Sequence, residues 1–139
     1  FIQVTGKGLE KLSSIFVDYA RENIEGVTDE TLQKYKDAPF RAPMIIILVS
    51  EIKIHPKVPE IEQMFSTAAA AENILLALNA LNYAGMWRTG VFALNEKISK
   101  YLKLKDNQKV IGYLYVGTAT GKQKKIPEMN ISEFVTEWI

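Results

Sequence analysis

The longest helical pattern in the chain is PEIEQMFSTAAAAENILLALNALNYA, residues 59–84. Pro59 can occupy the first position of a helix. Beyond Thr67 the only charged side chain is Glu72, and the alanine run 68–71 is followed by leucines and an isoleucine that surround the helix on most sides. A helix that is apolar nearly all round is either buried or crosses a membrane. The pattern therefore predicts one long central helix around which the rest of the fold is arranged.

The choice between a buried helix and a membrane span depends on the polar side chains. These stand at Glu72, Asn73, Asn79 and Asn82. A membrane span is disfavoured because a central charge in hydrocarbon costs about 2.5–3.5 kcal/mol. A small domain rarely encloses a helix on every side, and the alanines allow close approach of another backbone. We therefore expect a homodimer built on residues 64–84, in which the second copy supplies the missing layer, and no membrane partner.

The other expected elements mix helices and strands. Apolar or β-branched runs predict strands at 1–4, 44–49 and 110–116, three- and four-residue spacing predicts a helix at 9–24, and short helices are expected at 28–36 and 95–102. Thr28 and Asn95 can cap two of these helices. Gly85 is expected to end the long helix, with 85–90 as a compact connection. The apolar segment 131–139 is expected to dock on another surface. These patterns indicate an α+β fold in a single domain, 1–139.

Composition narrows the possible functions. The chain has 139 residues, 47% hydrophobic and 24% charged, with a formal net charge of +1 and no cysteine. A net charge this small gives no global attraction to nucleic acid. The absence of cysteine excludes disulfides, cysteine-ligated zinc, iron–sulfur clusters and thiol nucleophiles, and it suits a cytoplasmic protein.

Most isolated polar residues have a simple structural explanation. His55 is the only histidine, and we interpret it as an exposed loop residue rather than a contact to a flavin or substrate. Gly6 and Gly8 form a turn rather than a dinucleotide fingerprint, and Glu60 and Glu62 complement the dipole of the long helix. The lysines of 122–125 could hold a phosphate but are expected to be solvated. No catalytic residue and no metal site is predicted.

The segment Gly85-Met86-Trp87-Arg88-Thr89-Gly90 has a different character. Its two glycines allow sharp backbone turns. Between them lie a large aromatic surface, a permanent cation and a hydroxyl. A planar anionic cofactor needs apolar area for its rings and charge-assisted donors for its phosphate. On chemistry alone, a core tryptophan with a surface arginine remains an equally good explanation.

This segment resembles the Gly-x-Trp-Arg-(Ser/Thr)-Gly signature of the FMN-dependent nitroreductase family, in its compact YdjA-like branch. Further matches to the family follow in the same order along the chain. They are Ala38-Pro39-Phe40-Arg41-Ala42-Pro43, His55-Pro56-Lys57-Val58-Pro59, Glu62-Gln63 before the alanine-rich helix, the strand 110–118 and Phe134-Val135. Each motif alone is only moderately specific, and their ordered spacing over almost the whole chain carries the resemblance.

The resemblance implies a three-layer α-β-α sandwich, with a central sheet flanked by helices and a long central dimer helix. It also implies FMN at the subunit boundary, reduced by NAD(P)H, and electron acceptors such as nitroaromatics or quinones. Hydride transfer would follow a ping-pong scheme in which donor and acceptor use one cleft in turn. By the same resemblance, Trp87, Arg88 and Thr89 contact the FMN. Arg88 would supply charge or a hydrogen bond, Thr89 a hydrogen bond and Trp87 packing.

One departure from the family concerns the N-terminus. Members carry an N-terminal helix with Arg and Ser residues for the FMN phosphate, and this sequence opens directly on Phe1-Ile2-Gln3-Val4. We therefore expect an N-terminally incomplete member with too few phosphate donors, and an open groove beside Trp87 and Arg88. Two other interpretations stay open: a non-catalytic dimeric flavin-binding module and a structural dimerisation domain without a cofactor.

Overall fold

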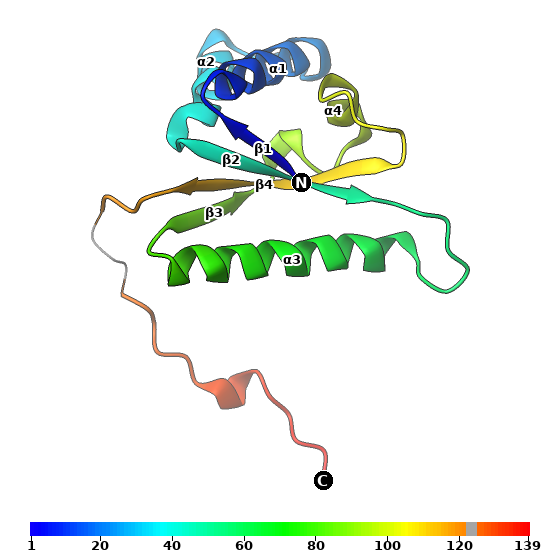
Figure 1. Ribbon diagram of the computed structural model, residues 1–139, viewed down its shortest axis with the longest axis vertical. Coiled ribbons are helices and arrows are strands. Elements are labelled where there is room, and N and C mark those ends of the chain that lie inside the picture. Colours follow the sequence, from blue (N-terminus) through cyan, green and yellow to red (C-terminus); the bar gives the residue numbers. More distant parts are fainter. Residues whose placement is uncertain (122–124) are drawn as a thin grey trace.

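A four-stranded antiparallel sheet separates two layers of helices (Figure 1). The computed structural model describes residues 1–121 and 125–139. The strands are β1 (Ile2–Thr5), β2 (Met44–Glu51), β3 (Ala84–Arg88) and β4 (Gln108–Gly117), in the order β1-β2-β4-β3. Every neighbouring pair is antiparallel. Strands β1 and β3 therefore form the two edges of the sheet.

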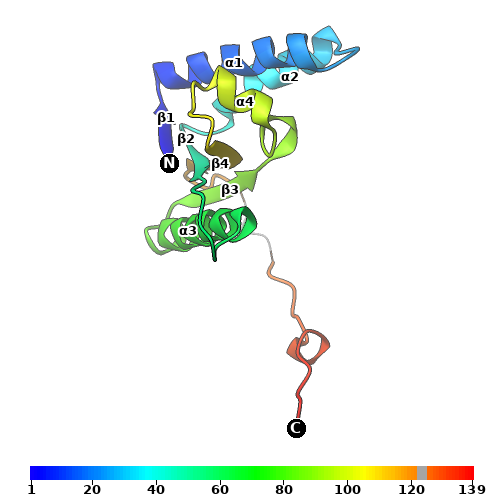
Figure 2. The ribbon, with the colours of Figure 1, turned by 90° about the vertical axis from the view of Figure 1, so that its right-hand side faces the viewer.

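The helices are divided unequally between the two faces of the sheet (Figures 1 and 2). One face carries α1 (Lys7–Asn23), α2 (Asp29–Asp37) and α4 (Glu96–Tyr101), and the other carries α3 (Glu60–Ala80) alone. Short 3₁₀ turns form η1 (Ala38–Arg41), η2 (Gly90–Phe92) and η3 (Ile131–Glu133). This arrangement confirms the predicted α+β, three-layer fold.

Local sequence signals explain how several helices begin. The Thr28 hydroxyl accepts a hydrogen bond from the Thr31 amide at 3.2 Å, and the Asn95 side chain accepts one from the Ile98 amide at 3.0 Å. Each of these contacts satisfies an amide that has no partner inside the helix, and such a cap contributes about 1 kcal/mol. Both predicted caps are confirmed. Pro59 takes the N-cap position of α3, one residue before the helix begins.

The end of α3 differs from the prediction. The helix stops at Ala80, and the chain reverses through Asn82, whose φ is +60°, with the Tyr83 amide donating to the Leu78 carbonyl at 2.8 Å. Asparagine tolerates this left-handed conformation, so it takes the place expected for Gly85. The predicted connection 85–90 is also wrong over most of its length, because residues 84–88 form β3 and pair with β4.

Two hydrophobic cores lie on the two faces of the sheet. On the side of α1 the core is built around aromatic side chains, and the rings of Phe16 and Phe92 stack with centroids 3.9 Å apart. On the side of α3 a smaller cluster contains Leu48, Leu114 and Ala71. Strand β4 contributes to both clusters because its side chains alternate between the two faces.

The outer surface of α3 remains open to solvent. Ala71 is the only fully buried residue of the helix, whereas Phe65 is 62% exposed and Leu76 is 59% exposed. This chain therefore leaves one side of the helix uncovered. A helix that is apolar on most sides needs to be covered on most sides. Among the described residues, none of the helices combines the length and apolarity needed to cross a membrane.

The described C-terminal residues lie apart from the sheet and its helices (Figure 1). Phe134 and Val135 are exposed, and Trp138 is 97% exposed. The docking expected for 131–139 therefore does not occur within this chain.

Candidate functional site

The candidate site lies on the α1 side of the sheet, along the edge strand β3 and its neighbour β4. The larger pocket has a volume of about 570 Å³ and is walled by aromatic side chains, so we call it the aromatic pocket. A second pocket of about 360 Å³, here the strand-edge pocket, runs along β3 to Gly117 and Thr118. Both pockets are lined by Arg41, Arg88 and Tyr115, which places these three residues at their junction.

Strand pairing determines which side chains reach this junction. Met86 pairs with Tyr115, and Arg88 pairs with Tyr113. Residues directly opposite one another on paired strands share a face of the sheet. Because both tyrosines belong to the core on the side of α1, Arg88 emerges on that side, next to the aromatic pocket.

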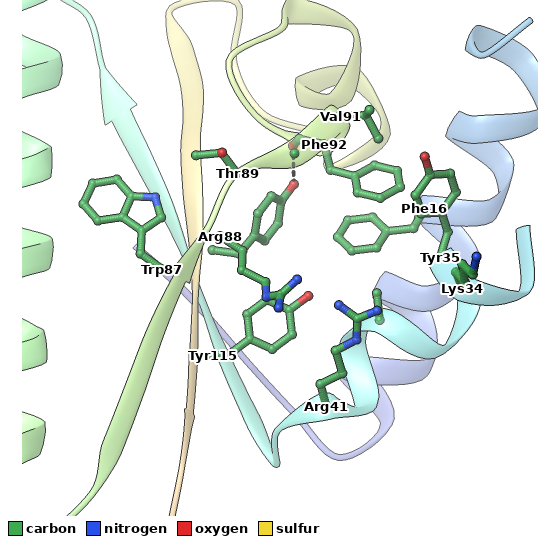
Figure 3. A pocket seen from close by; sticks show the side chains of 13 residues that line it. Phe16, Lys34, Tyr35, Arg41, Trp87, Arg88, Thr89, Val91, Phe92 and Tyr115 are labelled. Carbon is green, nitrogen blue, oxygen red and sulfur yellow. Dashed lines mark hydrogen bonds between the residues drawn. The ribbon is translucent and has the colours of Figure 1, made fainter. Parts of the chain in front are cut away.

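The indole of Trp87 takes the opposite face, since successive side chains of a strand alternate. It belongs to the cluster beneath α3 and lies directly over Gly112, where an added Cβ would be 2.0 Å from the indole Nε1. Trp87 borders the aromatic pocket, but Figure 3 shows its ring pointing away from Arg88. The three residues of the signature are therefore adjacent, but the Trp87 ring and the Arg88 guanidinium lie on opposite faces of the sheet.

The turn after β3 forms one wall of the aromatic pocket. Thr89 is exposed at the end of the strand, and Gly90 follows with a φ of +61°, a conformation that side chains disfavour. The buried Tyr113 hydroxyl donates to the Phe92 carbonyl at 2.6 Å and holds this turn against β4. Burial raises the pKa of Tyr113, so the hydroxyl remains a neutral donor.

The rings packed around Phe92, which belongs to this turn, continue the wall of the pocket. Phe92 stacks on Phe16, and Tyr35 meets Phe92 edge to face, with centroids 4.9 Å apart and an interplanar angle of 82°. Phe16 also meets Tyr113 edge to face at 5.5 Å. These contacts fix a rigid apolar surface beside the two arginines (Figure 3).

Positive charge dominates the junction of the pockets. Neither pocket is lined by an aspartate or glutamate within the part of the chain that the structure describes. Within that same part, Arg41 and Arg88 form no ion pair, and Arg88 Nε donates only to the Met86 sulfur at 3.3 Å. Burial raises the pKa of the Tyr115 hydroxyl, and the positive charges of Arg41 and Arg88 oppose that rise. The arrangement suits a ligand with a planar apolar part and an anionic group.

The remaining sequence candidates lie elsewhere or do not form a site. His55 is exposed in a loop, as interpreted from the sequence, and its Nδ1 accepts a hydrogen bond from the Lys57 amide at 3.2 Å. Glu60 pairs with Lys109 at 2.6 Å, a bond that raises the Lys109 pKa. The described residues contain no group of three histidines or carboxylates able to hold a metal ion. Of the lysine cluster, residues 122–124 lie outside the described residues.

Comparison with known proteins identifies the family of this chain. The sequence model of the nitroreductase family matches residues 2–118. The chain belongs to the nitroreductase family.

This nitroreductase-family chain is 31% identical over 118 residues to YdjA of Escherichia coli (strain K12), a protein whose name proposes NAD(P)H nitroreductase activity. The match covers 85% of the chain, which spans 63% of the length of that relative.

Solved structures agree on the fold. A nitroreductase-like family protein from Bacillus cereus superposes with a TM-score of 0.76 at 18% identity, covering 97% of this chain and 70% of that one. The FMN-dependent nitroreductase NfnB from Mycobacterium smegmatis, in complex with NADPH, superposes with a TM-score of 0.66 at 16% identity, covering 97% and 76%. At these identities the likeness concerns the fold alone.

Sequence reasoning found part of the junction and missed part. The signature identified Trp87, Arg88 and Thr89, which all border the aromatic pocket, and of these only Arg88 lies at the junction. Arg41 and Tyr115 were overlooked, although each stands inside a segment that matched the family. Alternation along the strand 110–116 would have placed Tyr113 and Tyr115 on one face, but nothing in the sequence indicated which helices would cover that face.

Proposed function

We propose that this chain is the flavin-binding part of an FMN-dependent NAD(P)H oxidoreductase that reduces nitroaromatic compounds, quinones or related electron acceptors. The observation that carries the proposal is the pair of adjoining pockets, in which packed rings lie beside Arg41 and Arg88 without a carboxylate among the described lining residues. Family membership, and the names of YdjA and of NADPH-complexed NfnB, support the same chemistry.

The residues at the site fit FMN chemically. The aromatic wall offers flat apolar area for a ring system, and the arginines offer charge-assisted donors for a phosphate. Thr89, exposed at the end of β3, offers a hydroxyl donor or acceptor. Trp87 acts from the other face by packing β3 against β4 and α3, which fixes the backbone that carries Arg88. When bound, FMN would supply the capacity to accept and donate a hydride.

The protein's own contribution is position and exclusion of water. The Tyr113–Phe92 hydrogen bond and the stacked rings hold the pocket wall rigid, so ordering a ligand there requires little rearrangement. Flavin chemistry needs no dedicated acid or nucleophile from the protein. We propose ping-pong kinetics, with the nicotinamide donor and the acceptor entering one cleft in turn.

A homodimer completes the proposal. The outer surface of α3 exposes Ile61, Phe65 and Leu76, and Leu81 is exposed directly after the helix. A second copy of the chain would cover this surface, and an obligate dimer typically buries more than ~2,000 Å². The exposed side chains of 131–139 offer further apolar area for the same partner.

The visible spectrum of the purified protein tests this function. We expect the bands of an oxidised flavin after addition of FMN, their anaerobic bleaching by NADH or NADPH, and their return when a nitroaromatic or quinone is added. Bound flavin that no nicotinamide nucleotide bleaches would favour the non-catalytic binding module. A protein that takes up no FMN would contradict the proposal and favour a structural dimerisation domain.

A further inference from the structure

Met86 is an exposed methionine on the same face of the sheet as Arg88. The two residues stand two positions apart on β3, so their side chains lie on the same side of the strand. Met86 pairs with Tyr115, lines the strand-edge pocket and is 54% exposed. Its sulfur is therefore open to small reagents in solution and lies next to the junction of the two pockets.

The four methionines of the chain differ in their surroundings. Met44 and Met64 are half-buried and pack against the cluster beneath α3. Met129 is 65% exposed, but it lies in the C-terminal part of the chain, away from the sheet (Figure 1). Among the described residues that line the two pockets, Met86 is the only methionine. Met129 therefore serves as an exposed methionine remote from the site.

The sulfur of Met86 is in direct contact with the guanidinium group of Arg88. Arg88 Nε donates to Met86 Sδ at 3.3 Å, and Arg88 has no other hydrogen-bond or ion-pair partner within the part of the chain that the structure describes. A thioether sulfur is a weak acceptor. This contact orients the guanidinium group but leaves its other N–H groups free for a ligand. A chemical change at the sulfur would therefore act directly on Arg88.

We propose that Met86 is an oxidation site whose sulfoxide binds Arg88 and makes it less available to ligands. Hydrogen peroxide is the oxidant: a sulfur–oxygen bond forms, the oxygen–oxygen bond of the peroxide breaks, the thioether is oxidised to a sulfoxide and the peroxide is reduced to water. Oxidation turns an apolar side chain into a polar one. The new oxygen accepts a charge-assisted hydrogen bond from Arg88, which is stronger than the bond to the sulfur that it replaces.

The consequence for ligand binding rests on the proposed function. An arginine that is bound to a sulfoxide offers fewer donors to an anionic cofactor or substrate. We expect the affinity for such a ligand to fall by a factor of about 3 to 10, as it would on the loss of one ordinary hydrogen bond. Methionine sulfoxide reductases reverse the modification, so the change would act as a switch rather than as permanent damage.

The first measurement needs no ligand. Purified protein is treated with increasing concentrations of hydrogen peroxide, and the gain of oxygen at each methionine is followed by peptide mass spectrometry. The Nε–H resonance of Arg88, assigned by its loss in Arg88→Lys, should shift in step with oxidation of Met86. The shift should persist in the control Met129→Leu and be absent in Met86→Leu. Oxidation of Met86 only after the half-buried methionines, or an Arg88 resonance that does not move when Met86 is fully oxidised, would refute the proposal.

The second measurement is the affinity of each protein for FMN before and after the same treatment. Wild type and Met129→Leu should bind FMN about 3- to 10-fold more weakly after treatment and recover with methionine sulfoxide reductases. The affinity of Met86→Leu, whatever its starting value, should not change on treatment. Unchanged affinity in fully oxidised wild type would refute the switch while the proposed function stands. Untreated wild type that binds no FMN would refute the proposed function, and the Arg88 resonance would still decide whether the sulfoxide binds Arg88.

Discussion

Gly112→Ala should destabilise the protein through a single contact. Gly112 is buried in the middle of β4, and an added Cβ would lie 2.0 Å from Trp87 Nε1 and 2.8 Å from its Cδ1. Ordinary contacts begin at 3.4 Å, so the indole would have to move by about 1.4 Å. The ring cannot retreat freely, because it is packed in the cluster beneath α3 with Leu75 and Leu78. Such overpacking typically costs about 1–3 kcal/mol.

The measurement is urea unfolding together with thermal melting. A loss of ~2 kcal/mol corresponds to a fall in Tm of about 5–10 °C for a domain of this size. Gly121→Ala is the matched control, since an added Cβ there meets nothing within 4 Å. Combining Gly112→Ala with Trp87→Leu should recover part of the loss, because the smaller side chain leaves room. If Gly112→Ala melts at the wild-type temperature, Trp87 does not lie against Gly112 and the orientation of β3 must be revised.

Three further predictions concern the ligand, the partner and pH. Arg88→Ala should weaken FMN binding about 10- to 150-fold, as loss of a charge-assisted hydrogen bond would, with little change in unfolding free energy; equal affinity in a folded variant would remove Arg88 from the site. Ala69→Trp, on the exposed side of α3, should shift the sedimentation profile from dimer toward monomer, whereas the control Ala119→Trp should leave it unchanged. A wild-type chain that sediments as a folded monomer at low concentration would rule out the dimer. Burial raises the pKa of Tyr113 above its ordinary value of 10.0, so its contribution to stability is complete below about pH 10 and is lost as pH rises further. Urea unfolding between pH 8 and 11 should show this loss, and a Tyr113→Phe variant that loses stability just as steeply would assign the effect to other groups.

The central elements of the fold follow from local pattern. The long apolar helix, the continuous apolar strands β2 and β4, and the caps at Thr28 and Asn95 each express rules that act over a few residues. Strand β3 was missed because it is short, has a glycine within it, and becomes a strand only by pairing with β4. Gly85 resembled a helix cap for the same reason, whereas the structure uses it to let β3 approach α3, where an added Cβ would lie 2.4 Å from Leu75.

The candidate site, like the fold, could be predicted only where a local sequence pattern marks it. The signature located Arg88 and Thr89, because chemistry-bearing residues between glycines are visible in a linear sequence. The partner cation at Arg41 is distant in sequence and meets Arg88 only through the tertiary arrangement of η1 and β3. In a strand, the side chains of successive residues such as Trp87 and Arg88 lie on opposite faces, whereas a loop imposes no such rule. Because the segment was interpreted as a connection, nothing in the sequence placed these two side chains on opposite faces of a sheet.

The most direct test of the central claim, that the junction of the two pockets binds FMN, is an experimental structure of the protein with FMN. We predict the flavin along β3 and β4 on the α1 side of the sheet, with Arg88 and Thr89 among its contacts and an anionic group near Arg41. Flavin bound on the α3 side, or at a place that Arg88 does not line, would contradict the account.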